Sequence, residues 1–208
     1  MEFNEENNYF SLTLYFTDPA RLNEVNLGFA ISASSLDSDR TFKLMQDVVK
    51  STMNKYPPAS IYYSVLSFGD PTVVHINFED KMSDEDRKRA IDSIVKPSGK
   101  ASLDKALDKA RSLFEEAATK RPTAKNILVV IVDKKSDSKL DDVKASARLL
   151  EDVGIKMVVV AVGNEVDQPE VLVVSPTSIL TNTTDKPDSV AEKIIKIIDK
   201  GEELVLTW

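Results

Sequence analysis

Oxygen-bearing side chains gather where two buried strands are predicted to end. Ser32 and Ser34 follow an apolar run that starts at Val25, and Asp133 follows the aliphatic run Asn126–Val132. In open α/β sheets, ligands bind beyond the carboxyl ends of the strands. Hydroxyl and carboxylate oxygens are hard ligands of the kind that Mg²⁺ and Ca²⁺ take. Ser32, Ser34 and Asp133 therefore define a candidate crevice for a metal ion.

The small number of carboxylates limits what this crevice can hold. Mg²⁺ keeps several waters and relies on carboxylate charge, so two hydroxyls and one carboxylate make a poor cage. We expect weak or absent Mg²⁺ or Ca²⁺ binding and predict no firm cofactor. Asp37 and Asp39, in the first loop, could supply a replacement charge or could cap the next helix. Asp133 itself is either a weak metal ligand or a turn residue hydrogen-bonded to Ser32 or Ser34.

Composition and missing motifs argue against enzymatic chemistry and against two classes of partner. The 208-residue chain has no cysteine and a single histidine, His75, on a predicted edge strand. There is no G-x-G-x-x-G after a strand, no P-loop and no G-x-S-x-G elbow. The net charge of −7 argues against binding to nucleic acid. No run approaches the roughly 18 apolar residues that a membrane span needs, so membrane insertion is not expected.

Alternating apolar runs and amphipathic stretches supply the elements that position the crevice. Unbroken Val/Ile runs are typical of parallel strands that helices cover on both faces. The pattern predicts a doubly wound α/β fold with a mostly parallel six-stranded sheet, one antiparallel edge strand and extra terminal β-strands. The strands of the main sheet are expected at Val25–Ile31, Ile61–Phe68, Thr72–Phe78, Asn126–Val132, Lys156–Val162 and Ser178–Leu180. Helices are expected at Arg40–Lys55, from Ser83 to about Val95, from a cap at Ser102, at Leu140–Val153 and at Ser189–Lys200.

The chain length is slightly more than one domain of roughly 150 residues. Residues 22–200 hold the α/β pattern. Residues 1–21 form an N-terminal extension in which Tyr9–Phe16 alternates like a strand, and residues 201–208 hold a C-terminal strand. Because the termini of a domain often lie close together, these two strands are expected to pair with each other.

Several segments together resemble a von Willebrand factor type A domain over roughly Leu22 to Lys200. Val25–Ser34 resembles the first strand of that family and its D-x-S-x-S loop, and Ser64–Asp70 resembles the strand that ends in Phe-Ser/Gly-Asp. Asn126–Asp133 resembles the strand that usually ends in Thr-Asp-Gly, and Leu149–Asn164 is the most specific stretch. The resemblance is strongest to matrilin-like members of the extracellular matrix.

The resemblance implies a degenerate metal-ion-dependent adhesion site. The family uses an Asp, two Ser, a Thr and a second Asp. Carried over position by position, Ser32, Ser34 and Asp133 are kept, whereas the first Asp falls on Ala30 and the Thr falls near Ala101.

Further side chains are predicted to form a partner-binding rim around the crevice. Ser102, next to Ala101, could take the place of the missing threonine. Lys134 and Lys135 follow Asp133 on the same rim, or form a solvated entry to the next helix. The complete predicted rim consists of Ser35, Asp37, Ser102, Lys134 and Lys135.

The resemblance implies a non-enzymatic adhesion module that binds collagen or other matrix proteins with little or no metal dependence. Further domains of the same protein are another expected class of partner. The acidic, polar residues 1–8 are not a signal peptide, so secretion would require one that has been removed. Asn182 begins a glycosylation sequon that has meaning only in a secreted chain. The alternative is a cytoplasmic scaffold domain of a multiprotein complex.

Overall fold

The computed structural model describes residues 24–34, 38–56, 60–96 and 101–200. Its six-stranded sheet has the order β3-β2-β1-β4-β5-β6, and all neighbours are parallel except β2 and β3. The predicted doubly wound sheet with one antiparallel edge strand is therefore confirmed. The strands are β1 Val25–Ser32, β2 Ile61–Phe68, β3 Val73–Ile76, β4 Lys125–Lys134, β5 Ile155–Glu165 and β6 Ser178–Thr181.

The helices match the predicted pattern with one addition. A short helix between β5 and β6 was not predicted; it begins after Asp167, whose side chain accepts a hydrogen bond from the Glu170 N–H, and it has Pro169 in its first turn. Proline in the first turn and an aspartate cap are typical helix starts. The helices are α1 Asp39–Lys55, α2 Asp84–Asp92, α3 Leu103–Lys120, α4 Leu140–Asp152, α5 Gln168–Val174 and α6 Pro187–Lys200.

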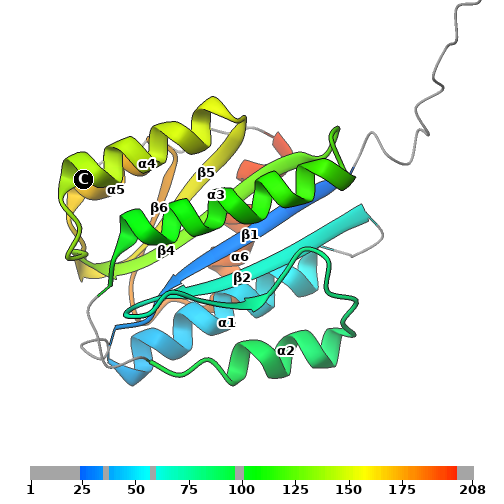
Figure 1. Ribbon diagram of the computed structural model, residues 1–208. Coiled ribbons are helices and arrows are strands. Elements are labelled where there is room, and N and C mark those ends of the chain that lie inside the picture. Colours follow the sequence, from blue (N-terminus) through cyan, green and yellow to red (C-terminus); the bar gives the residue numbers. More distant parts are fainter. Residues whose placement is uncertain (1–23, 35–37, 57–59, 97–100, 201–208) are drawn as a thin grey trace, which may run out of the picture.

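Both faces of the sheet are covered, as the unbroken aliphatic runs of β4 and β5 require (Figure 1). Alternate residues of these strands point to opposite faces. Val129 and Val158 therefore join the apolar cluster under α1, α2 and α6, whereas Val130 and Val159 join the cluster under α3, α4 and α5. Two separate layers of core hold the strands in register.

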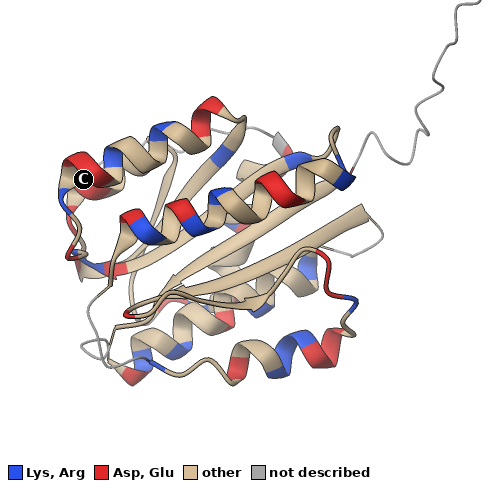
Figure 2. Cartoon of the chain, in the orientation of Figure 1, with Lys and Arg blue, Asp and Glu red and all other residues tan. Residues whose placement is uncertain are grey.

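Charged residues lie mainly on the helices, as the colours of Figure 2 show, and residues of both signs occur along most of these helices. The acidity of the chain is therefore spread over helix surfaces. Within the described residues, no helix combines the length and the apolarity that a bilayer crossing would need.

The described chain begins and ends at the amino edge of the sheet, the edge where the parallel strands start. β1 starts at this edge. The end of α6 lies there too, beside the end of α1, since the Tyr56 hydroxyl that follows α1 donates a hydrogen bond to the Asp199 carboxylate. The two predicted terminal strands, Tyr9–Phe16 and Glu203–Trp208, lie outside the described residues. Their pairing and the domain boundaries at 21 and 201 stay predictions.

Candidate functional site at the carboxyl edge of the sheet

The predicted crevice residues lie at the same edge of the sheet and are all buried. The ladder between β1 and β4 ends at the pair Ile31 and Ile131, so Ser32, Ser34 and Asp133 follow at neighbouring strand ends. Ser32 and Ser34 are each 2% exposed and Asp133 is 7% exposed. The topology thus assembles the predicted crevice from two segments about 100 residues apart.

The two positions where the family resemblance expects further ligands carry methyl groups. Ala30 is fully buried and pairs with Leu66 on β2 and Val130 on β4. Ala101 is 6% exposed, and its carbonyl accepts a hydrogen bond from the Asp137 N–H at 2.9 Å. Both side chains belong to the apolar cluster under α3, α4 and α5, so neither can donate an oxygen to the crevice.

The rim residue Ser102 does not cap α3 with its side chain, contrary to the prediction. Ser102 occupies the N-cap position without a side-chain hydrogen bond. Ser138, in the loop after β4, accepts the Asp104 N–H at 3.3 Å and donates to the Asp104 carboxylate. The cap comes from a loop distant in sequence, which a local pattern could not reveal.

The first loop is also capped differently from the prediction. Ser35 and Asp37 lie outside the described residues, so their predicted roles stay open. Ser38 caps α1 by accepting the Thr41 N–H at 3.1 Å. Asp39 instead forms a hydrogen-bonded ion pair with Lys96 at 2.6 Å, and that hydrogen bond lowers the pKa of the Asp39 carboxyl. Its charge is therefore directed toward Lys96.

The loop after β4 is anchored by α5, the helix that was not predicted. The Ser136 N–H donates to Glu170 Oε2 at 3.0 Å, and the Ser136 hydroxyl donates to Glu170 Oε1. Glu170 is only 4% exposed. A buried carboxylate needs such donors, and here they fix the loop that carries the predicted rim lysines.

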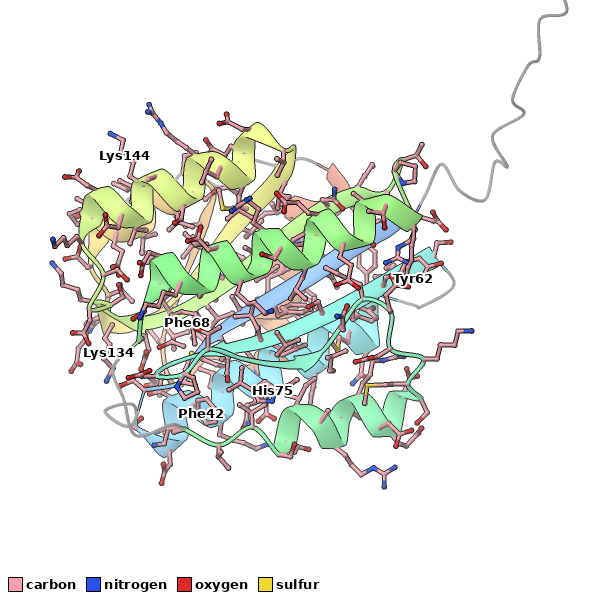
Figure 3. All side chains as sticks on the ribbon, viewed as in Figure 1. Phe42, Tyr62, Phe68, His75, Lys134 and Lys144 are labelled. Carbon is pink, nitrogen blue, oxygen red and sulfur yellow. The ribbon has the colours of Figure 1, made fainter. Side chains whose placement is uncertain are left out.

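Both rim lysines lie close to carboxylates. The Lys134 ammonium is 4.0 Å from Asp133 Oδ2, and the Lys134 side chain is largely buried. The Lys135 ammonium is 3.4 Å from Asp167 Oδ1 and is well exposed. Figure 3 shows Lys134 at the carboxyl end of the sheet. A positive charge thus stands beside the only carboxylate that the family resemblance retains.

The crevice opens into a hollow surface along the ends of β5 and β6. Two adjoining cavities of about 220 and 440 Å³ share Gly163 and Asn164, and together we call them the strand-end trough. The smaller cavity is lined by Ser38, Thr41, Asp133, Lys134, Val162, Gly163, Asn164, Glu165 and Thr183. The larger is lined by Gly163, Asn164, Val166, Gln168, Leu180, Thr181 and Asn182.

Sequence reasoning missed most of the trough, although the signal was present. Asn164 and Thr183 follow the predicted strands 156–162 and 178–180, just as Asp133 follows its strand. The rule that ligands bind beyond strand ends applies to them equally. Gln168 was missed for another reason, because it belongs to the short helix α5 that was not recognised.

Among the described residues, the predicted crevice is poor in carboxylates. It offers the hydroxyls of Ser32 and Ser34 and the carboxylate of Asp133, with the Lys134 ammonium 4.0 Å from that carboxylate. Within the part of the chain that the structure describes, no group of three or more His, Cys, Asp or Glu side chains could hold a metal ion. Mg²⁺ and Ca²⁺ sites normally draw on more carboxylate charge than this.

His75 lies on the edge strand β3, as predicted, and contacts a serine. Its Nε2 is 2.7 Å from the Ser67 hydroxyl oxygen. Burial lowers the pKa of His75, which favours the neutral ring. Ser67 is 2% exposed, whereas His75 is partly exposed, so the serine hydroxyl is the enclosed member of the pair.

Asn182, the predicted glycosylation acceptor, is exposed in the turn after β6. Its N–H donates to Asp185 Oδ2 at 3.0 Å, and Thr181 Oγ1 donates to the same oxygen at 2.8 Å. The hydrogen bond to the Asn182 backbone lowers the pKa of the Asp185 carboxyl. This turn presents the carboxamide of Asn182 at the edge of the strand-end trough.

Comparison with known proteins places the fold and the sequence in one family. Residues 26–192 match the von Willebrand factor type A domain. The chain is 24% identical to human vitrin over 156 residues, which is 74% of this chain and 23% of vitrin, and 26% identical to mouse vitrin over 128 residues, which is 60% of this chain and 20% of that protein. It therefore spans less than a quarter of these relatives.

A solved structure of similar fold is proximal thread matrix protein 1 from the mussel byssus, with a zinc-occupied metal-ion-dependent adhesion site. The TM-score is 0.73 at 21% sequence identity, covering 85% of this chain and 46% of the mussel protein.

Proposed function

Because the chain belongs to the von Willebrand factor type A domain family, we propose that it is a non-enzymatic adhesion module of an extracellular matrix protein. Its partners are collagen or other matrix proteins, together with further domains of the same protein. The observation that carries this proposal is the strand-end trough, which lies at the edge where doubly wound folds bind their ligands. Similarity to a matrix protein of the mussel byssus supports the setting.

The proposed binding depends little or not at all on a metal ion. Ala30 and Ala101 lack ligand oxygens, and the Lys134 ammonium already lies beside Asp133. Calorimetry with Mg²⁺, Ca²⁺ and Mn²⁺ is expected to give no micromolar binding. Micromolar binding that Asp133→Ala abolishes would overturn this part of the proposal.

A gain-of-function variant makes the metal experiment more decisive. Ala30→Asp restores the carboxylate that the family resemblance expects in the first strand. If the missing charge is the cause of weak binding, this variant is expected to bind Mn²⁺ more tightly than the unmodified chain. Equal, weak binding by both proteins would show that the crevice fails for another reason.

The partner class is tested by binding to immobilised fibrillar collagen and to matrix extract, with and without a chelator. Binding that survives the chelator is the expected result. Loss of binding with the chelator contradicts metal independence, whereas failure to bind either material contradicts the partner class. Variants of the trough then localise the contact.

We also propose that the chain is secreted and glycosylated at Asn182. Its exposure in the turn after β6 makes the sequon accessible. Expression through a eukaryotic secretory pathway is expected to add glycan mass, and Thr184→Ala should remove it while leaving Asn182 in place. Secreted protein without glycan mass would contradict the assignment and would favour the cytoplasmic scaffold alternative.

A further inference from the structure

Strand β5 continues beyond the point where β6 stops pairing with it. The last pair of the β5–β6 ladder is Val162 with Thr181, whereas β5 runs on to Glu165. The ladder with β4 is irregular here and resumes only at Glu165 with Lys134. Gly163 has a φ of +83°, which bends the strand at this point. The main chain of residues 163–165 therefore borders the trough where the described part of β6 no longer pairs with it.

The side chains around this open segment resemble the peptide group in their chemistry. Asn164, Gln168 and Asn182 each bring a carboxamide, which both donates and accepts hydrogen bonds. Val166 and Leu180 supply apolar surface between them. Such a surface suits a ligand with alternating donors and acceptors and short side chains, which is what an extended polypeptide offers.

Other ligand classes fit the trough less well. The residues known to line it, all from the described part of the chain, include no aromatic ring on which a planar ligand could stack. At the other end of the trough, Asp133 and Glu165 outnumber Lys134 in charge. An acidic segment would be repelled there. Every described residue that lines the larger cavity is uncharged and offers no partner to a buried charge, so an uncharged segment suits that cavity best.

We propose that the strand-end trough binds an extended, uncharged peptide segment of a protein partner by β-strand addition. The segment lies beyond the end of β6, pairs its main chain with residues 163–165, and is held on its other side by the carboxamides of Asn164, Gln168 and Asn182. This inference rests on the proposed protein-binding function and names the part of the partner that is recognised. The carboxylates of the crevice repel acidic competitors.

The binding experiment uses isotope-labelled protein and two synthetic peptides, followed by NMR. The first probe is an acetylated and amidated hexapeptide of sequence Ser-Val-Thr-Val-Thr-Ser. The second has the same sequence with alternate amides N-methylated, which removes the donors that strand addition needs. Saturable shifts at residues 163–165 and 180–182 with the first probe, and binding about tenfold weaker with the second, are expected.

Matched variants separate the carboxamides from general surface effects. Asn164→Ala and Asn182→Ala are each expected to weaken the hexapeptide by about fivefold, the loss of roughly one hydrogen bond. Asn54→Ala, at an exposed carboxamide on α1, should change nothing. Equal binding of the methylated peptide, shifts elsewhere on the protein, or no saturable shift would each overturn the inference.

The outcome is distinguishable from that of the proposed function. Collagen or matrix binding that is unaffected by Asn164→Ala and Asn182→Ala overturns strand addition alone. Peptide binding at the trough without any matrix binding supports strand addition and contradicts the proposed partner class.

Discussion

The two ends of the sheet treat their polar groups in opposite ways. At the amino edge, the Arg121 guanidinium donates to Asn26 Oδ1 at 2.9 Å and to Glu79 Oε1 at 2.7 Å, and it lies 3.8 Å from the centre of the Tyr62 ring. Asn26 in turn donates to Asn126, its partner on β4, at 2.8 Å. The result is a closed network in which a buried charge meets acceptors and an aromatic face.

At the carboxyl edge, buried polar groups border open space instead. Asp133 and its neighbour Lys134 line the strand-end trough, and Figure 3 shows Lys134 and Tyr62 at opposite ends of the sheet. A closed network stabilises the fold, whereas polar groups that line a hollow remain accessible to a ligand. We infer that the polar groups of the amino edge mainly stabilise the fold, whereas those of the carboxyl edge are placed to contact a ligand.

The largest expected effect comes from breaking the amino-edge network. Arg121→Ala removes the donor that Asn26 and Glu79 share, leaves Glu79 paired with Lys120 alone, and removes the cation over Tyr62. The free energy of unfolding is expected to fall by about 3 kcal/mol, because removing one partner of a buried charged network is costly. Urea unfolding followed by circular dichroism measures the loss.

A matched arginine keeps this test specific to the network. Arg111, on α3, pairs with Glu115 at 2.8 Å on the helix surface. Arg111→Ala is expected to change the free energy of unfolding by no more than about 0.5 kcal/mol. Equal losses for the two variants would mean that the amino edge is not the special end of the sheet.

The spacing of apolar residues could predict the sheet, because each strand is recognisable from its own few residues. The aliphatic runs that became β4 and β5 need no knowledge of the rest of the chain. Arg121 was not singled out, because its partners Asn26 and Glu79 lie 95 and 42 residues away. No local sequence pattern indicates contacts between residues so far apart in the chain.

The carboxyl edge was predictable only in part, for a related reason. Strand ends identified Ser32, Ser34 and Asp133, which the topology brings to one edge of the sheet. The Ser136–Glu170 anchor and the cap from Ser138 depend on α5 and on loops folding back, so they follow from tertiary packing. The hollow between the ends of β5 and β6 depends on where each strand stops, which is the least predictable property of an element.

A pair of glycine variants tests the two edges of the sheet directly. One glycine lies in the turn before β5 and the other lies on β5 itself. Gly154, at the amino edge, has a φ of +78°, and Gly163, at the carboxyl edge, has a φ of +83°. Alanine at either position should cost about 1 kcal/mol of unfolding free energy, since an L side chain resists this conformation. Only Gly163→Ala is expected to weaken the hexapeptide as well, because Gly163 lines the trough. Equal peptide binding by both variants would count against the trough.

Removing the charge of Asp133 should affect stability less than either glycine. Asp133→Asn keeps the shape of the side chain and loses its attraction to the Lys134 ammonium, which is 4.0 Å away. The expected loss is about 0.5 kcal/mol, because the neutral amide also avoids the desolvation cost of a buried carboxylate, which offsets the lost attraction. A loss as large as that for Arg121→Ala would show that the carboxyl edge is also a stabilising network, and the contrast between the ends would fail.

The smallest effect is a pH dependence that separates the edges. Hydrogen bonds from Lys120 and Arg121 lower the pKa of Glu79 against the opposing effect of burial, so this contribution of the amino edge is present above the ordinary value of 4.5 and is lost as the pH falls through the lowered pKa. His75 contacts Ser67 near the carboxyl end of β2, so it reports on the carboxyl edge. Burial lowers the pKa of His75 below its ordinary value of 6.5, so the unfolded chain takes up that proton first. The contribution of His75 to stability is therefore complete above pH 6.5 and declines as the pH falls from 6.5 toward the lowered pKa of the folded protein.

His75→Gln should make the free energy of unfolding less dependent on pH between about pH 7 and pH 5. The loss of stability at lower pH that comes from Glu79 should stay unchanged. An unaltered slope in that window would assign the titration to groups other than His75, and the two edges could then not be distinguished by pH.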